Sequence, residues 1–323
     1  MHSNNETDQL NPETKIYLET LKKSAGQIDP QAISILRKLK DSKFDSFLVG
    51  GCVRDILVGI PPKDFDIATN ALPNEVKKKI SYCFIIGRRF KLVHARRGDK
   101  IFEIATYRRE ATTEEIESSA LAEAQFTEEN YFGTLKEDSF RRDFTINALF
   151  YDPIEQSLVD FCSGLRDISL RIIRIIGSPV ERLKEDPIRI LRAIRLSHKL
   201  NFQIEPELRK AIFEHAEDLV RTAPPRRREE WLKFFKLPNQ DNVWIDLYDL
   251  NILKFVLPTF HSLFENSEKR ELFLSYVRRR SYIGFDLSNN IESFAIIIYS
   301  YLLTEHEHPS KINIREISEM LSF

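Results

Sequence analysis

The spacing of apolar residues divides the chain into two parts. From about residue 44 to 161, short β-rich runs alternate with turn signals, and from about 165 onward helical periodicity dominates. The pattern therefore predicts a strand-containing part followed by a helical part. Strands are predicted at 47–49, 65–69, 90–95, 100–107, 147–151 and 158–161, and helices at 53–58 and from Pro73 onward.

Residues 186–200 have the pattern of an amphipathic helix. At about 100° per residue, one half of this helix carries apolar side chains and the other half carries polar ones. Asp186 and Arg189 lie one turn apart and point the same way, which would suit a bidentate polar site, although a solvated helix face is the simpler interpretation. The apolar half holds Ile188, Ile190, Leu191 and Ile194, and the polar half holds Asp186, Arg189, Arg192 and Arg195.

Composition is that of a folded protein with room for about two domains. The 323 residues are 42% hydrophobic, and 48 Lys and Arg nearly balance 49 Asp and Glu. No apolar run approaches the roughly 18 residues of a membrane span, and the polar start does not resemble a secretory signal. Cys52, Cys83 and Cys162 are widely spaced, which indicates neither a disulfide framework nor a zinc site. We therefore expect a cytoplasmic protein.

Charge is nevertheless distributed unevenly along the chain. The stretch 110–130 has seven acidic residues and no Lys or Arg, and we expect it to form a mobile loop. Basic clusters occur at 226–228 and 278–280, among other places. One arginine triplet is usually a solvated face, but several along one chain favour a polyanionic partner.

A pair of glycines marks a candidate phosphate site. Gly50 and Gly51 come at a predicted strand-to-helix turn, where the backbone can approach a ligand closely and helix N–H groups favour an anion. Arg54 lies in the first turn of that helix and could clamp a phosphate oxygen. The sequence has neither a P-loop motif nor the glycine pattern of dinucleotide-binding folds.

A pair of carboxylates follows shortly afterwards. Asp64 and Asp66 should project from one face of a strand, with Phe65 turned into the core. Carboxylates this close repel unless a cation lies between them, and hard oxygen ligands suit Mg²⁺. Such a pair on a surface strand is more often solvated, but next to a phosphate-binding turn it indicates metal-assisted phosphoryl or nucleotidyl transfer.

Four linked motifs resemble those of the class II nucleotidyltransferases, the family of bacterial poly(A) polymerases and CCA-adding tRNA nucleotidyltransferases. They are GGCVRD at 50–55, DFD at 64–66, RRDFTIN at 141–147 and EDPIR at 185–189. The resemblance covers about residues 44–235 and implies an α+β fold, with a DNA polymerase beta-like mixed-sheet head followed by an all-helical neck and body. It implies a flexible or helical segment at 1–29, a head at 30–165, a neck at 166–235 and a body at 236–323.

The same resemblance assigns roles to residues. Asp64 and Asp66 match the catalytic carboxylates that bind two Mg²⁺ ions, and Asp143 matches a residue described as the third carboxylate. Glu103, on a predicted strand of the same sheet, is an alternative third carboxylate, and the sequence leaves the choice open. The implied nucleotide-binding residues are Gly50, Gly51, Arg54, Arg142, Asp143, Asp186, Arg189 and Arg192.

The product of the reaction is harder to infer. The runs 85–94 and 130–134 resemble the poly(A) polymerase branch, apart from Ala95, where that branch usually has a branched aliphatic residue. We therefore expect addition of AMP from ATP to RNA 3′ ends, with CCA addition to tRNA as the alternative. A binding protein with a decayed site should lack at least one motif carboxylate or glycine, and none is missing.

We expect the helical part to bind the RNA, whether mRNA, small RNA or tRNA. Trp231 or Tyr248 could stack a base, although aromatic residues are more often in the core. Many relatives carry a long basic C-terminal extension, whereas this sequence stops at Phe323, so an RNA-binding host factor could assist. The arginines expected to neutralise RNA phosphates are Arg192, Arg195, Arg226, Arg227 and Arg228.

Overall fold

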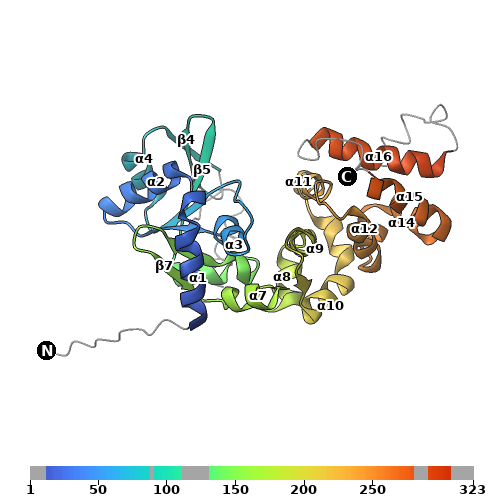
Figure 1. The fold of residues 1–323 in the computed structure, drawn as a ribbon, viewed down its shortest axis with the longest axis horizontal. Helices are drawn as coiled ribbons and strands as arrows, with labels where there is room; N and C mark the ends of the chain where they lie inside the picture. The colour runs from blue at the N-terminus through green and yellow to red at the C-terminus, as the bar shows by residue number, and fades with distance from the viewer. Residues whose placement is uncertain (1–11, 88–90, 111–130, 280–289, 307–323) are drawn as a thin grey trace, which may run out of the picture. The chain divides into compact units, whose positions relative to one another are not determined.

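The computed structural model describes residues 12–87, 91–110, 131–279 and 290–306. The chain forms two compact units, residues 1–170 and 171–323 (Figure 1). The first unit contains a large mixed sheet and the second is almost entirely helical, which confirms the predicted α+β class. The further division of the helical part into neck and body stays a prediction.

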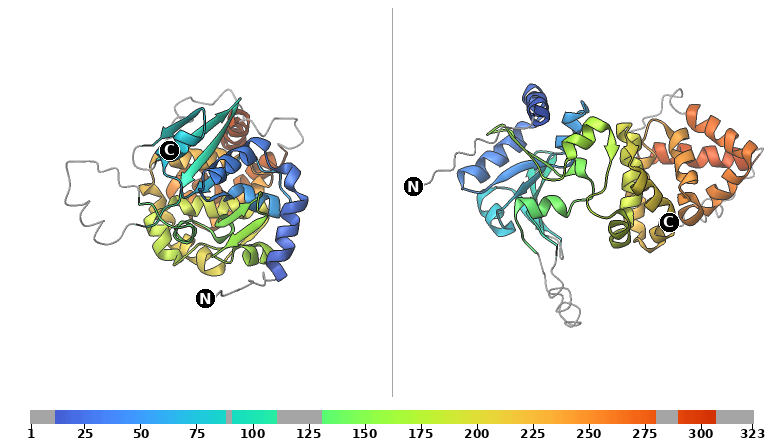
Figure 2. Two further views of the ribbon diagram at one scale, coloured as in Figure 1. Left: turned by 90° about the vertical axis from the view of Figure 1, so that its left-hand side faces the viewer. Right: turned by 90° about the horizontal axis from the view of Figure 1, so that it is seen from below.

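The first unit is built on a sheet of seven strands in the described part of the chain, in the order β3-β4-β5-β2-β1-β6-β7. Only β2 and β5 run parallel, and the other neighbours are antiparallel. β4 and β5 form the longest hairpin of the sheet (Figures 1 and 2). The strands are β1 (Ser46–Val49), β2 (Asp66–Thr69), β3 (Cys83–Ile86), β4 (Leu92–Arg97), β5 (Lys100–Thr106), β6 (Leu149–Asp152) and β7 (Ser157–Asp160).

Helices pack against this sheet. Alternation of buried and exposed residues along each strand gives the sheet two different faces. The Cys83 thiol donates to the carbonyl of Ile80 at 3.0 Å, just after α4, so α4 covers the face that holds Cys83. The helices are α1 (Pro12–Lys23), α2 (Pro30–Asp41), α3 (Gly51–Leu57), α4 (Pro73–Lys79), α6 (Leu135–Phe140) and α7 (Gly164–Leu170), with short 3-10 turns η1 (Ala25–Gln27) and η2 (Thr145–Asn147).

The second unit consists of helices and one small parallel pair of strands. Several of its helices begin with proline, whose fixed φ and missing N–H suit the first helical position. The elements are β8 (Ile172–Ile173), α8 (Pro179–Glu185), α9 (Ile188–Leu200), β9 (Gln203–Ile204), α10 (Pro206–Glu214), η3 (Ala216–Arg221), α11 (Pro224–Phe234), α12 (Gln240–Asp249), α13 (Ile252–Val256), α14 (Pro258–Glu265), α15 (Ser267–Arg279) and α16 (Asn290–Glu305).

Most predicted elements are present, with three main differences. The predicted strand 147–151 begins only at Leu149, because residues 145–147 form a 3-10 turn. The strand β3 lies in a continuous apolar run without a period of two, which gave no strand signal. The predicted helix 186–200 begins only at Ile188, because Asp186 precedes Pro187 and adopts an extended conformation, with φ −143° and ψ 92°. The acidic stretch lies outside the described residues, except for Glu110.

No helix in residues 12–87, 91–110, 131–279 or 290–306 combines the length and the apolar character that crossing a membrane requires.

Of the aromatic residues predicted as base-stacking candidates, Trp231 is 1% exposed and packs against Phe234 and Phe235. Tyr248 packs against His261 and Phe264. Trp231 is therefore a core residue, as the simpler interpretation held.

An aromatic cluster forms part of the core of the second unit. Trp244 is 1% exposed, stacks on Phe260 at 4.6 Å between ring centroids and meets Phe273 edge-on at 5.2 Å. Offset and edge-on pairs of this kind add to the free energy gained from burying apolar area. Gln240 accepts the indole N–H, which satisfies the one polar atom of the Trp244 side chain.

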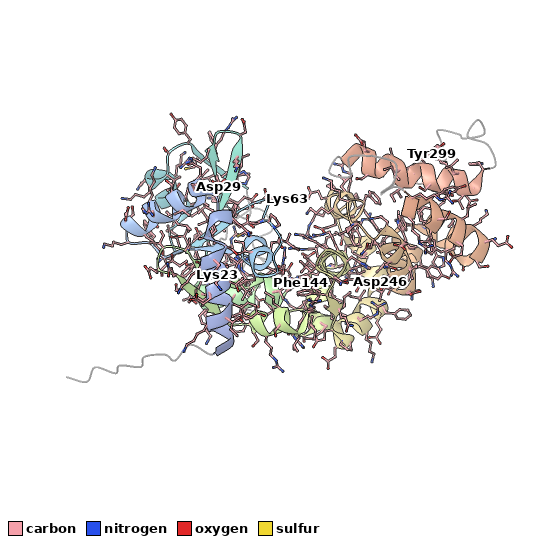
Figure 3. All side chains as sticks on the ribbon, viewed as in Figure 1. Lys23, Asp29, Lys63, Phe144, Asp246 and Tyr299 are labelled. Carbon is pink, nitrogen blue, oxygen red and sulfur yellow. The ribbon has the colours of Figure 1, made fainter. Side chains whose placement is uncertain are left out.

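We expect Trp244→Ala to lower the free energy of unfolding by about 3–5 kcal/mol, because it removes a large fully buried side chain. Tyr299→Ala is the control, since Tyr299 on α16 is 52% exposed, and it should change that free energy by no more than about 0.5 kcal/mol (Figure 3). Urea denaturation followed by circular dichroism measures both. Equal shifts for the two variants would contradict this description of the core.

Candidate active site

The glycine turn lies at the junction of β1 and α3. Gly50 is the residue before the helix and has φ +74°, a conformation that glycine adopts without strain. A β-carbon at Gly50 would lie 3.6 Å from Nη1 of Arg142, so the backbone of the turn runs close to that guanidinium. The structure thus brings together two motifs that are about 90 residues apart in the sequence.

Arg54 does not point freely at this turn. Its Nε and Nη2 donate to Oδ1 of Asp55 at 2.9 and 2.6 Å, and its Nη1 donates to Oδ1 of Asn147 at 2.5 Å. The residue is only 5% exposed. These contacts tie α3 to the segment 141–147, so Arg54 holds the turn in place rather than extending from it.

Both arginines of the RRD motif bind one buried carboxylate. Asp138, inside α6 and 1% exposed, accepts from Nη2 and Nε of Arg142 at 2.8 and 3.2 Å, and from Arg141. Although burial disfavours its charge, Arg142 and Arg141 hold the pKa of Asp138 below its usual range. The sequence motifs did not single out Asp138. It nevertheless lies three and four residues before Arg141 and Arg142, a spacing that brings side chains together on a helix.

Asp143 takes part in a second network. Its Oδ1 accepts from the backbone N–H of Phe144 at 2.8 Å and from Nδ2 of Asn147 at 3.1 Å. Asn147 in turn accepts from Arg54, so it connects Asp143 with α3. The role of Asn147 was not predicted, because its partner Arg54 is 93 residues away.

The carboxylate pair lies at the start of β2. Phe65 is 7% exposed, whereas Asp64 and Asp66 are both exposed, which matches the predicted arrangement around a buried aromatic residue. The strand begins at Asp66, so Asp64 belongs to the preceding loop. The negative charge of Asp64, two residues away, nevertheless helps to raise the pKa of Asp66.

Glu103 is the neighbour of Asp66 on the next strand. β2 and β5 are parallel with Ile67 opposite Ile104, which places Asp66 beside Glu103 on one face of the sheet. Oε1 of Glu103 also lies 3.3 Å from Nε2 of His94 on β4. The structure therefore brings Glu103, the alternative third carboxylate, next to the carboxylate pair.

The electrostatics of this cluster are unfavourable without a cation. Asp66 reaches solvent, yet partial burial among protein atoms raises its pKa to about 6, and the charges of Glu103 and Asp64 act in the same direction. Arg142 opposes the shift, which shows that its guanidinium is close enough to act on Asp66. The cluster thus favours binding of a proton or a metal ion.

The carboxylates of this site suit Mg²⁺ better than they suit a metal ion that is coordinated by protein side chains alone. Within the described ranges, no group of three or more His, Cys, Asp or Glu side chains could hold a metal ion by itself, so Glu103 does not complete a protein-only site with Asp64 and Asp66. Mg²⁺ usually keeps several waters and binds one or two carboxylates together with substrate phosphates. Asp64 and Asp66 supply such a pair, and the positive charge of Arg142, which acts on Asp66, suits a phosphate as its partner.

The second unit holds the predicted base-reading pair. Asp186, between α8 and α9, accepts from Nη1 and Nη2 of Arg226 at 3.0 and 2.8 Å. Arg189 is 9% exposed, and its Nη1 donates to Oε2 of Glu185 and to the carbonyl of Arg182, both at 2.7 Å. Partner residues thus hold both side chains, and Arg226 contacts Asp186 instead of extending freely into solvent.

The other predicted arginines differ in their surroundings. Nε of Arg195 donates to Oε2 of Glu230 at 2.6 Å, in an ion pair between α9 and α11. Arg192 and Arg227 are half-buried, whereas Arg228 is exposed. Among these residues, Arg228 is therefore best placed to meet a polyanion in solution.

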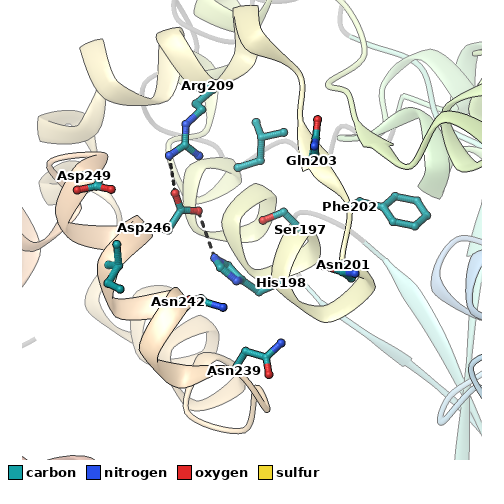
Figure 4. Close-up of a pocket in the computed structure, with 12 residues that line it drawn as sticks. Ser197, His198, Asn201, Phe202, Gln203, Arg209, Asn239, Asn242, Asp246 and Asp249 are labelled. Atoms are coloured by element: carbon teal, nitrogen blue, oxygen red, sulfur yellow. Dashed lines mark hydrogen bonds and ion pairs between the residues drawn. The ribbon is translucent and has the colours of Figure 1, made fainter. Parts of the chain in front are cut away.

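The second unit also contains a cavity of about 490 Å³ (Figure 4). In its wall, Asp246 accepts from Nη2 of Arg209 at 2.6 Å and lies 3.2 Å from Nε2 of His198. No residue predicted as part of the active site lines this cavity. The lining residues are Ser197, His198, Asn201, Phe202, Gln203, Ile204, Arg209, Asn239, Asn242, Ile245, Asp246 and Asp249.

Comparison with known proteins agrees with this architecture. Residues 46–174 match the family model "Poly A polymerase head domain", and residues 201–264 match "Probable RNA and SrmB- binding site of polymerase A". Poly(A) polymerase I of Salmonella typhi is 37% identical over 249 residues, which are 76% of this chain and 54% of that protein. A CCA-adding enzyme of Lactobacillus delbrueckii subsp. bulgaricus is 35% identical over 207 residues, 64% of this chain and 50% of that protein.

Solved structures show the same fold. A crystal structure of Bacillus stearothermophilus CCA-adding enzyme in complex with CTP superposes with a TM-score of 0.65 at 24% identity, covering 91% of this chain and 75% of that one. The fold thus defines a nucleotidyltransferase-type head followed by a helical part. The chain belongs to the family that comprises the poly(A) polymerases and the CCA-adding enzymes. It spans about half the length of these relatives.

We expect Asp66→Asn to raise the melting temperature by a few degrees near pH 8 with EDTA present. The folded-state pKa of Asp66 is raised from 3.8 to about 6, so ionisation destabilises the fold fully above about pH 6 and not below about pH 4. The gain should therefore disappear near pH 4. Asp99→Asn, at an exposed turn, is the control, and an equal gain from it would refute the argument.

Proposed function

We propose that the chain is a template-independent RNA nucleotidyltransferase that adds AMP from ATP to RNA 3′ ends. The observation that carries the proposal is the cluster of Asp64, Asp66 and Glu103 close to Arg142 and the Gly50 turn, in a chain of this family. Carboxylates for metal ions and a cation for phosphate are the groups that nucleotidyl transfer needs.

In this proposal Asp64 and Asp66 hold two Mg²⁺ ions, and Glu103 is the third carboxylate. When bound, the ions would lower the pKa of the RNA 3′-hydroxyl and neutralise charge on the pyrophosphate leaving group. The position of Glu103 beside Asp66 supports this choice. Asp143 instead accepts two hydrogen bonds within its own turn, which supports a positioning role.

The triphosphate would lie at the Gly50–Gly51 turn. Gly50 and Gly51 carry no side chains of their own, and Arg142 is adjacent and cationic. Arg142 itself is oriented by Asp138 and packs over the ring of Phe150 at 5.0 Å. A guanidinium held from two sides loses little entropy when it binds a phosphate or ribose.

The adenine base would be read by Asp186 and Arg189. Asp186 accepts a base amino group, and Arg189 donates to a ring nitrogen. A carboxylate has about four lone-pair sites, so the bidentate contact with Arg226 leaves acceptor capacity on Asp186. Arg192 completes the nucleotide-binding set, and Arg195, Arg227 and Arg228 are assigned to RNA phosphates, with help from an RNA-binding host factor.

Addition of CCA to tRNA is the second candidate. The observation that supports this alternative is that CCA-adding enzymes occur both among the sequence relatives and among the similar solved structures. Labelled RNA with ATP alone, or with CTP and ATP, separates the two. Long A tails on any RNA 3′ end indicate the polymerase, and two C residues and one A on a tRNA acceptor indicate the alternative.

We expect Asp64→Ala and Asp66→Ala each to lower the rate of AMP incorporation by about a thousandfold or more, because a metal ion stabilises the transition state by several kcal/mol. Circular dichroism should show an unchanged fold. Asp99→Ala is the matched control and should retain the rate of the original protein. A near-normal rate for either active-site variant with Mg²⁺ would refute the assignment.

Substitutions of Arg226 and Arg228, both on α11, should affect nucleotide binding and RNA binding separately. Arg226→Gln should raise the KM for ATP by up to about fivefold, because Asp186 loses the ion pair that orients it. Arg228→Gln should instead raise the KM for RNA and weaken the salt dependence of RNA binding. Steady-state kinetics with each substrate varied in turn measures both. Identical effects of the two substitutions would contradict this division.

A further inference from the structure

The edge strand β3 and Tyr82, the residue directly before it, expose a row of large side chains. Tyr82, Phe84 and Ile86 are 80%, 63% and 47% exposed. Cys83, between two of them, is buried toward α4. The exposed row, called here the β3 row, consists of Tyr82 and of Phe84 and Ile86, which alternate with Cys83 and therefore point away from the helix side of the sheet.

The β3 row shares its face of the sheet with the carboxylate cluster. Phe84 is opposite His94 on β4, and His94 is opposite Glu103 on β5. Glu103 lies beside Asp66. One row of neighbouring residues, called here a rung, therefore crosses four strands of the sheet, from Phe84 through His94 and Glu103 to Asp66. Three strand spacings separate the ends of this rung, a distance of about 14 Å.

Two further features distinguish this surface from an ordinary exposed edge. Tyr82 has φ +51°, which is uncommon for a bulky residue, and its carbonyl accepts the N–H of Arg96 at 2.9 Å. Arg96 is exposed and lies two residues beyond His94, on the same face of β4. Besides the carboxylates Glu103 and Asp66, the face thus carries aromatic rings and the positive charge of Arg96.

We propose that the β3 row is a stacking surface for unpaired bases of the RNA strand whose 3′ end lies at the carboxylate cluster. The inference rests on the proposed function. Aromatic rings beside a cationic groove bind single-stranded nucleic acid without sequence preference, as a template-independent enzyme requires. Arg96 supplies the charge complementarity, and the shared face supplies the continuity with the reacting end.

The geometry also gives the position of the stacked bases. Bases stacked at about 3.4 Å would need about four steps to cover 14 Å. The β3 row should therefore contact bases about four nucleotides before the 3′ end, and not the terminal base. This position distinguishes the row from the residues that bind the incoming nucleotide.

The experiment compares Phe84→Ala with Phe161→Ala in the full chain. Phe161 is 42% exposed and follows β7, at the opposite edge of the same sheet, which makes it a matched control. Loss of one stacking contact should raise the Kd for single-stranded RNA about tenfold for Phe84→Ala. Phe84→Trp should restore binding, and the KM for ATP should stay unchanged in every variant.

A second readout locates the base. In RNA that carries 2-aminopurine four nucleotides from the 3′ end, fluorescence should fall on binding to the original protein and to Phe84→Trp, but much less with Phe84→Ala. The binding assays need no ATP, so they separate this inference from the proposed function. If the original protein adds no nucleotide to RNA, the proposed function fails, whatever the binding assays show.

Two results would overturn the inference. One is that Phe84→Ala lowers the affinity for RNA no more than Phe161→Ala does, and that both variants quench the 2-aminopurine fluorescence equally. The other is concentration-dependent dimerisation that Phe84→Ala abolishes, measured by analytical ultracentrifugation, because β3 would then be covered by a second copy of the chain.

Discussion

The buried carboxylate of Asp138 is the interaction on which the arrangement of the head depends. Removing a charge from water is strongly unfavourable unless hydrogen bonds and opposite charges compensate, and Arg141, Arg142 and the N–H of Arg108 do so here. This contact fixes Arg142 over Phe150, beside the Gly50 turn and near Asp66. A buried carboxylate thus determines where the half-buried guanidinium of Arg142 lies.

The site itself works against the stability of the fold. Carboxylates gathered on one face of β2 and β5 repel one another, and the cluster becomes favourable only when cations arrive. One apolar cluster of the head, formed by Val49, Ala68, Tyr107 and Phe150, adjoins these carboxylates, since Val49 is directly opposite Asp66. Function and stability are therefore supported by different residues of the same sheet.

Local patterns in the sequence predicted the parts of the structure that local forces determine. The glycine turn, the carboxylates around Phe65 and the apolar half of α9 follow from periodicity and turn chemistry. Contacts between distant segments could not be predicted in this way, because no alternation or spacing encodes them. The partner of Arg54 is 93 residues away, and the partner of Asp186 is 40 residues away.

The parallel pairing of β2 with β5 has a consequence for sequence change in the head. Side chains alternate along a strand, so a shift of one position in this pairing would turn Glu103 to the helix-covered face and bring Phe102 or Ile104 to the solvent. Insertions that leave both strands in place can accumulate in the connecting turns. A single added residue inside β5 before Glu103 would instead disassemble the carboxylate cluster without altering any of its members.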